Sequence, residues 1–302
     1  MSGIAGTWTI AAAALGTPAG IGLLLWGAAA LAWLAVLATY ASTGVRSGAS
    51  LLAELRHPLL GPFAALVPVV AILVGGELAR YWLFGGTVLV TAGLIVVALL
   101  SAWSLAEWLT GSIDARLFHP GYFLSVVAGG LIGAIGLASV GAHDFAVVAF
   151  WIGVFFWLVL SAVIIARLAA LSEFPAGLLP TLAIFSVPPS VAGIAWFGIN
   201  GERLDVVHDV LLGLMLFLLL SQLFLIPRYA RVPFGIGYWS FTFTVAAPAT
   251  YGIHWLLLAR PFGWQGWAWL ILAVATLWIS WIAARSVGQV FSRVALARTV
   301  AK

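Results

Sequence analysis

Long uninterrupted apolar runs constrain the fold of this chain more than any other feature of its sequence. Two examples are FWIGVFFWLVLSAVIIARL at residues 150–168 and VLLGLMLFLLLSQLFLI at residues 210–226. A helix needs roughly 20 apolar residues to cross the hydrocarbon core of a bilayer. Because the runs are continuous and do not alternate with polar residues, they exclude a transmembrane β-barrel. The sequence therefore predicts an all-α polytopic membrane protein.

Polar breaks divide the chain into ten candidate transmembrane helices. Only 7% of the 302 residues are charged and the mean hydropathy is +1.17, whereas a soluble domain carries about a quarter charged residues. We therefore expect one transmembrane domain over residues 1–302 and no separate soluble domain. The expected helices are residues 2–17, 20–42, 59–78, 82–110, 119–140, 144–171, 178–198, 206–227, 233–256 and 264–288.

Glycine and proline concentrate in the odd-numbered segments. Proline-bearing helix starts fall near residues 58, 120, 180 and 233, about 60 residues apart, which indicates a degenerate repeat of one helical hairpin. Kinked backbone is tolerated in membranes where protein or water satisfies its polar groups. We therefore expect five hairpins around a central pore, with the odd-numbered helices inside. In this arrangement Pro120, Pro188 and Pro189 lie at bends in the inner helices.

Basic residues are distributed unequally between the two sides of the expected membrane topology. Ten arginine and lysine residues fall on the side that carries both termini, and three fall on the other side. The positive-inside rule then places both termini in the cytoplasm and the protein in the cell (cytoplasmic) membrane. Orientation in a lipid bilayer explains the net charge of +4 better than nucleic-acid binding does.

The sequence offers little for catalysis. It contains no cysteine, and it lacks the HExxH, GxSxG and Gly-rich phosphate-loop motifs, so we expect neither an enzyme nor a cofactor. Asp205, His208 and Asp209 fit either a metal site or a solvated helix start. The helix start is favoured because one imidazole and two carboxylates are a weak ligand set, and no metal is expected.

Two histidines, His57 and His119, each precede a proline at the start of an expected helix. A helix entrance at the membrane interface is the simpler interpretation of both. A pH sensor or an anion contact is the alternative, because histidine changes charge near neutral pH.

The middle of the odd-numbered segments carries hydroxyl and aromatic residues in place of charges. Proton-coupled carriers usually place an ionisable group at that depth. Hydroxyl donors and the positive edges of aromatic rings attract anions weakly, and weak binding suits a conducting path. Packing between helices is the alternative role for each residue. The hydroxyl residues are Thr7, Thr9, Ser125, Ser186, Ser190, Ser240, Thr242 and Thr244.

Four motifs together resemble those of a known family. They are RHPLLGPF at 56–63, FHPGYF at 118–123, FSVPPSVAGIAW at 185–196 and PFGIGYWSFTF at 233–243. In order and spacing they resemble the TehA tellurite-resistance and C4-dicarboxylate transporter family, which is related to the plant slow-type (SLAC/SLAH) anion channels. The resemblance extends from end to end of the chain. It implies five hairpins around a central pore and a homotrimer in which each subunit has its own pore.

The resemblance also implies a phenylalanine in the ninth helix that plugs the pore. The family pattern Trp-Ala-aromatic-Ser/Thr-Phe is matched by WSFTF at 239–243, which makes Phe243 the expected gate. An error in register would point to Phe241, the aromatic residue two positions upstream. The expected pore-lining and kink residues are Pro120, Gly121, Phe123, Phe185, Pro188, Pro189, Phe241 and Thr242.

Taken together, the residues and the resemblance predict a gated pore for small inorganic or dicarboxylate anions. A proton-coupled transporter or exporter of C4-dicarboxylates, sulfite or tellurite is the alternative. An integral membrane enzyme is the least favoured function, because the chain shows no convincing cluster of acids or histidines at one membrane face.

Overall fold

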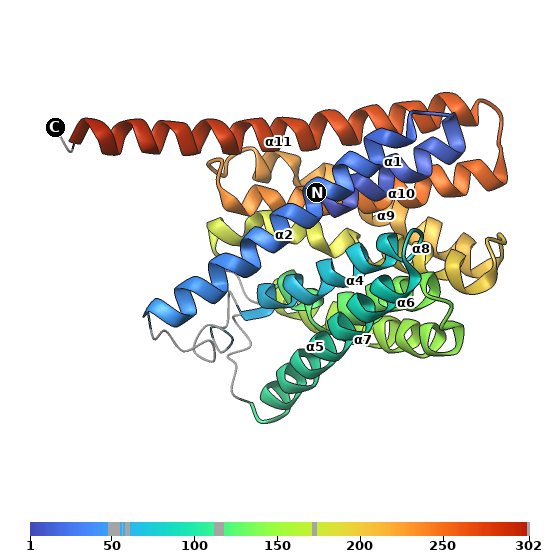
Figure 1. The fold of residues 1–302 in the computed structure, drawn as a ribbon, viewed down its shortest axis with the longest axis horizontal. Helices are drawn as coiled ribbons and strands as arrows, with labels where there is room; N and C mark the ends of the chain where they lie inside the picture. Colours follow the sequence, from blue (N-terminus) through green and yellow to red (C-terminus); the bar gives the residue numbers. More distant parts are fainter. Residues whose placement is uncertain (48–54, 56, 58–60, 112–117, 171–173, 301–302) are drawn as a thin grey trace.

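The computed structural model describes residues 1–47, 55, 57, 61–111, 118–170 and 174–300. Every regular element in these ranges is an α-helix or a 3-10 helix, and the helices pack into one bundle (Figure 1). The predicted all-α fold is confirmed. Arg56, Pro58 and Arg116, which entered the motif and charge arguments, lie outside the described residues.

Five helical hairpins make up the bundle, and the two members of each hairpin differ. The outer members are the single helices α2 (Ala19–Ser47), α5 (Leu83–Leu109), α7 (His143–Ala170), α9 (Val206–Tyr229) and α11 (Trp264–Val300). The inner members are α1 (Ser2–Leu15), η1 (Gly61–Ala65) with α4 (Leu66–Leu78), η3 (Pro120–Leu124) with α6 (Val126–Ser139), η4 (Ala176–Ser186) with α8 (Pro188–Asn200), and η5 (Ile236–Trp239) with α10 (Ser240–Ala259).

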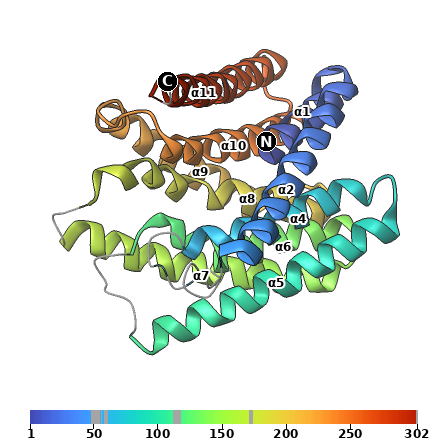
Figure 2. The same cartoon turned by 60° about the vertical axis from the view of Figure 1, so that its left-hand side comes forward.

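The inner helices form a closed ring. Helix α1 contacts α4, and contacts continue from α4 to α6, from α6 to α8, from α8 to α10, and from α10 back to α1. Each outer helix packs against its own hairpin partner. The five short turns within the hairpins lie at one end of the bundle, on the right in Figure 1, which we call the turn end. Helix α11 extends past the other helices at the opposite end in Figure 1, and Figure 2 shows it at the edge of the bundle beside α10.

Glycine sets how closely the helices of this bundle approach. A Cβ atom added to Gly130 of α6 would lie 2.6 Å from the backbone of Gly153 in α7, and one added to Gly193 of α8 would overlap the ring of Tyr251 in α10. Membrane helices associate through such close contacts, since lipid tails are as apolar as leucine and give no hydrophobic drive. The small residues of the sequence therefore specify which helix faces meet.

The outer surface of the bundle is apolar. Within the described residues, nine helical segments are long and apolar enough to cross a membrane, and α1 is a shorter apolar helix of 14 residues. Only 11% of the most apolar stretch of α9 is buried inside the protein, against 67% of the corresponding stretch of η3 and α6. Large side chains such as Leu99, Phe155 and Phe224 are exposed on outer helices. The chain is a multi-pass membrane protein.

Four inner members are irregular in a way that the sequence does not specify: each begins with a 3-10 segment before it becomes α-helical. At the start of α8 the cause is Pro188 and Pro189, which occupy its first positions and carry no N–H to continue the preceding hydrogen-bond ladder. Pro120 instead occupies the first position of η3, so it begins a helix and does not bend one.

Candidate functional site

A cavity of about 550 Å³ lies inside the ring and is lined by all five inner helices. Helix α10 shows how one helix face is used. Its cavity residues are Phe243, Ala247, Thr250, His254 and Leu257, and steps of three and four residues place side chains on a single helical face. The other lining residues include Gly3, Thr9 and Ala13 of α1, Ile72, Gly76 and Glu77 of α4, Ile132 and Ser139 of α6, and Val191, Ile194 and Phe197 of α8.

The cavity runs from the middle of the bundle to the turn end. Phe243 and Val191 lie in the first turns of α10 and α8, and they mark its inner end. Arg80 and Glu202 also line it, and they belong to the turns that follow α4 and α8. We call the group formed by Glu77, Arg80, Glu202 and His254 the mouth of the cavity.

The ring of Phe243 faces the cavity because α1 leaves room for it. A Cβ atom on Gly3 would lie 3.2 Å from Phe243 Cδ2, so glycine at this position lets α1 pass close to the ring. Phe241 lies about 200° away around the helix. It is buried in the outer layer against Tyr229 and Tyr238, with ring centroids 5.0 Å and 5.5 Å away. The structure places Phe243, and not Phe241, on the cavity.

The other aromatic candidates lie beyond Phe243, toward the end of the bundle opposite the turns. Phe123 of η3 and Phe185 of η4 contact each other with ring centroids 5.5 Å apart. Phe123 is buried and Phe185 is partly buried, and neither lines the cavity. Thr242 does not line it either, and its hydroxyl donates a hydrogen bond to the Trp239 carbonyl oxygen at 2.7 Å.

The histidine-proline-glycine sequence at 119–121 forms a helix cap. His119 is fully buried, and its Nδ1 accepts a hydrogen bond of 3.1 Å from the Gly121 N–H. A Cβ atom on Gly121 would overlap the imidazole ring, so only glycine fits there. His57 is exposed. Neither histidine lines the cavity, so the helix-entrance interpretation describes their positions better than an anion contact in the cavity does.

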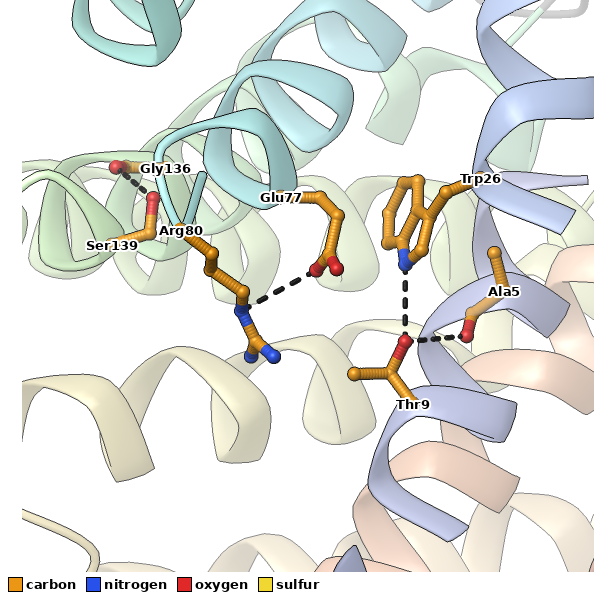
Figure 3. A network of polar contacts seen from close by, with 7 residues as sticks. All are labelled: Ala5, Thr9, Trp26, Glu77, Arg80, Gly136 and Ser139. Atoms are coloured by element: carbon orange, nitrogen blue, oxygen red, sulfur yellow. Dashed lines mark hydrogen bonds and ion pairs between the residues drawn. The ribbon is translucent and has the colours of Figure 1, made fainter. Parts of the chain in front are cut away.

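Three hydroxyl groups on the cavity wall donate to their own helices. Thr9 donates to the Ala5 carbonyl at 3.0 Å, Ser139 to Gly136 at 2.7 Å and Thr250 to Ala246 at 2.9 Å; the first two bonds are drawn in Figure 3. Of the eight hydroxyl residues proposed from the sequence, Thr9 is the one that lines the cavity. An anion inside therefore meets an apolar wall with few hydrogen-bond donors.

Two acid–base pairs stand at the mouth. Arg80 Nε lies 3.4 Å from Glu77 Oε2, and His254 Nε2 lies 3.8 Å from Glu202 Oε1. The Glu77 carboxylate points into the space between Arg80 and the Trp26–Thr9 pair of α2 and α1 (Figure 3). None of the site residues expected from the sequence belongs to the mouth. The one signal in the sequence is an acid three residues before an arginine at the end of an apolar run.

The wall behind His254 is a stack of three rings. Phe197 of α8 lies between His254 of α10 and His208 of α9, with centroid distances of 4.1 Å and 3.8 Å. Tyr251 Oη donates to the His208 carbonyl at 3.1 Å and lies 3.1 Å from His208 Nδ1. The stack and these bonds tie three helices together at the side of the mouth.

Asp205 caps the start of α9. Its carboxylate accepts hydrogen bonds from the His208 backbone N–H at 3.1 Å, from Trp196 Nε1 at 2.9 Å and from Asn200 Nδ2 at 3.1 Å. Burial by itself would raise the pKa of Asp205, but these hydrogen bonds hold it below its usual value. The cluster around His208 is thus organised as a helix start. No group of three or more possible metal ligands occurs among the described residues.

Comparison with known proteins gives a consistent result. Residues 1–287 match the family described as voltage-dependent anion channel, SLAC1. The chain is 30% identical over 198 residues to the tellurite resistance protein TehA homologue of Haemophilus influenzae, which covers 65% of this chain and 60% of that protein. It is 32% identical over 148 residues to the guard cell S-type anion channel SLAC1 of Arabidopsis thaliana, which covers 48% of this chain and 26% of that protein.

A third relative, the S-type anion channel SLAH2 of Arabidopsis thaliana, is 26% identical over 238 residues, which covers 75% of this chain and 44% of that protein. The chain thus spans less than two thirds of the length of each of these relatives. The family match covers nearly the whole chain and agrees with the resemblance of the four motifs. This protein belongs to the SLAC1/TehA family of voltage-dependent anion channels and transporters.

Proposed function

We propose that this protein conducts small anions through the central cavity and that Phe243 is the gate. The observation that carries the proposal is the position of Phe243. Its ring stands at the inner end of a cavity to which every inner helix contributes a face. Membership of an anion channel and transporter family supports the same function at a coarser level.

The size and the apolar surface of the Phe243 side chain explain how it closes the pore. A phenylalanine ring at a constriction blocks an ion sterically and leaves an apolar surface that water wets poorly, which is one way in which channels close. Between this ring and the mouth the wall is mostly apolar, and the hydroxyl hydrogens of Thr9, Ser139 and Thr250 are engaged. Anions are therefore held weakly in the cavity, as conduction requires.

The decisive experiment compares Phe243→Ala with the parent protein in planar bilayers under anion gradients. Removal of the ring should raise the anion current at least about tenfold, which corresponds to a barrier lowered by about 1.4 kcal/mol. Phe241→Ala is the matched control, since it removes the same side chain from the opposite face of α10 and should not raise the current. If Phe241→Ala raises it instead, the gate is assigned to the wrong ring. If neither does, the plugged pore is excluded.

Proton-coupled transport of C4-dicarboxylates, sulfite or tellurite is the second candidate. The observation in its favour is Glu77, an acid on the cavity wall with a side chain only 12% exposed, since coupled carriers use shielded acids of this kind. Flux measured in vesicles with voltage and pH gradient set independently separates the two functions. A channel follows the voltage at zero pH gradient, whereas a coupled transporter drives uphill accumulation from the pH gradient alone.

We further propose a homotrimer with one pore in each subunit, in the cell membrane, with both termini in the cytoplasm. The trimer is supported by the family resemblance, and the orientation by the excess of basic residues at the end of the bundle opposite the turns. Native mass spectrometry in mild detergent tests the trimer. Accessibility of tags at both termini in sealed right-side-out vesicles tests the orientation.

A further inference from the structure

The two acid–base pairs at the mouth share one arrangement, with acid and base exchanged. Each joins a shielded cavity residue to an exposed partner: the side chains of Glu77 and His254 are 12% and 13% exposed, whereas those of Arg80 and Glu202 are 62% and 66% exposed. The shielded member is an acid in one pair and a base in the other. All four residues line the cavity.

An entering anion feels the shielded members most strongly. Water and salt screen charges on exposed side chains, whereas partly buried charges are screened much less. With Glu77 ionised and His254 neutral, the shielded pair carries one negative charge, which repels anions. Protonation of His254 and then of Glu77 changes that charge from negative to positive. Acid therefore converts a repulsive mouth into an attractive one.

Few other ionisable groups face this pair. Around His254 they are Glu202 in the turn after α8, Tyr251 on α10 itself, and His208 on α9 with Asp205 and Asp209 beside it. Around Glu77 the one charged neighbour that contacts it is Arg80, among the described residues. Helix α1, which lines the same cavity, has no ionisable side chain in Ser2–Leu15.

We propose that Glu77 and His254 form a proton-binding site that controls anion entry, so that acidification of the compartment at the turn end increases anion flux. The inference rests on the proposed anion pathway and adds to it a regulator and the side from which it acts. Gain of one proton by this pair changes its charge by one unit, and one unit charge acting over several ångströms in a hydrated mouth should change the flux by about fivefold.

The test uses full-length protein in planar bilayers, with Phe243→Ala as the background so that the gate does not limit the current. Chloride current is recorded while the pH on each side in turn is lowered from about 8 to about 5, the range in which histidine titrates. We expect the current to rise about fivefold on acidification of one side only. Glu77→Gln should raise the current already at the alkaline end. His254→Gln should remove most of the rise.

Matched controls separate this site from a general pH effect. His143→Gln replaces an exposed histidine at the same end of the bundle, outside the cavity, and Glu107→Gln replaces an acid near the opposite end of α5. Both should keep the full pH response. The His254 ring stacks on Phe197, so His254→Gln can fail to fold. In that case the alkaline current of Glu77→Gln still tests the proposal.

Three results would overturn the inference: a current that is flat with pH, an equal response from both sides, or an alkaline current unchanged by Glu77→Gln. A background variant that conducts at every pH without a pH response rejects the regulator and leaves the proposed anion pathway intact. Absence of current at every pH rejects both.

Discussion

The inner and outer helices of this bundle are both apolar, yet they are built in different ways. The outer helices are continuous and leave most of their surface for lipid, whereas four of the inner ones begin as 3-10 segments and bury up to 67% of their most apolar stretch. The most buried spans are not the most hydropathic ones. In a membrane, apolar side chains are as stable against lipid as against protein. Which helices are buried inside the bundle therefore depends more on their small residues and backbone breaks than on their hydropathy.

Helix α10 contains this contrast within three residues. Phe243 borders the cavity of the inner ring, and Phe241 packs in an aromatic cluster with Tyr238 of η5 and with Tyr229 and Trp278 of the outer helices. The same side chain therefore serves two purposes according to the helix face that carries it. We expect side chains on the two faces, and in the two layers, to contribute differently to stability.

The largest effect on stability should come from Phe241→Ala. Loss of this buried ring leaves a void among close-packed aromatic residues, which should lower the free energy of unfolding by about 3–5 kcal/mol. Phe243→Ala should cost clearly less, because its ring already borders an open cavity. Thermal unfolding in detergent, followed by tryptophan fluorescence, measures both variants. Equal losses would mean that the two faces of α10 are packed alike.

A smaller effect is expected where α6 of the inner ring meets α7. A methyl group at Gly130 would lie 2.6 Å from the Gly153 backbone, and backbone cannot move aside, so Gly130→Ala should destabilise by about 2–3 kcal/mol. Gly213 on the outer helix α9 has open space around it. Gly213→Ala should be neutral or stabilise by up to about 1 kcal/mol. Similar melting temperatures for the two variants would contradict the close contact.

The smallest effect concerns the turn that joins α8 to α9. Asp205→Asn keeps a capping side chain but removes its charge, so the loss should be about 1 kcal/mol or less near neutral pH. The pKa of Asp205 is lowered in the folded protein, so its contribution is present above the usual aspartate pKa of about 4. It is lost as the pH falls through the lower folded value.

The parent and Asp205→Asn proteins should therefore converge in stability at strongly acidic pH. Unfolding midpoints measured from neutral to acidic pH test this, with Asp209→Asn as the control, since Asp209 lies in the first turn of α9 but is not the cap. A gap between the two proteins that stays constant with pH would show that the charge of Asp205 does not matter.

Much of the fold could be predicted because it follows from local pattern. The ten segments, their order and their pairing into hairpins follow from apolar run length and from the recurrence of proline. The Phe243 candidate followed from family resemblance, and the structure places its ring on the cavity. The 3-10 segments were not foreseen, since the same residues are compatible with a continuous helix until neighbouring helices satisfy the freed backbone groups.

The sequence by itself determined that this protein lies in a lipid bilayer, how many helices it forms and which of them are broken, because each of these depends on local composition. Only the tertiary structure decided which face of each helix lines the cavity and that Glu77 and His254 both stand on its wall. It also decided that the hydroxyl hydrogens of Thr9, Ser139 and Thr250 turn back to their own helices. The physical reason is that lipid and protein interior are equally apolar. Hydrophobic periodicity therefore cannot distinguish the face that meets lipid from the face that meets the central cavity.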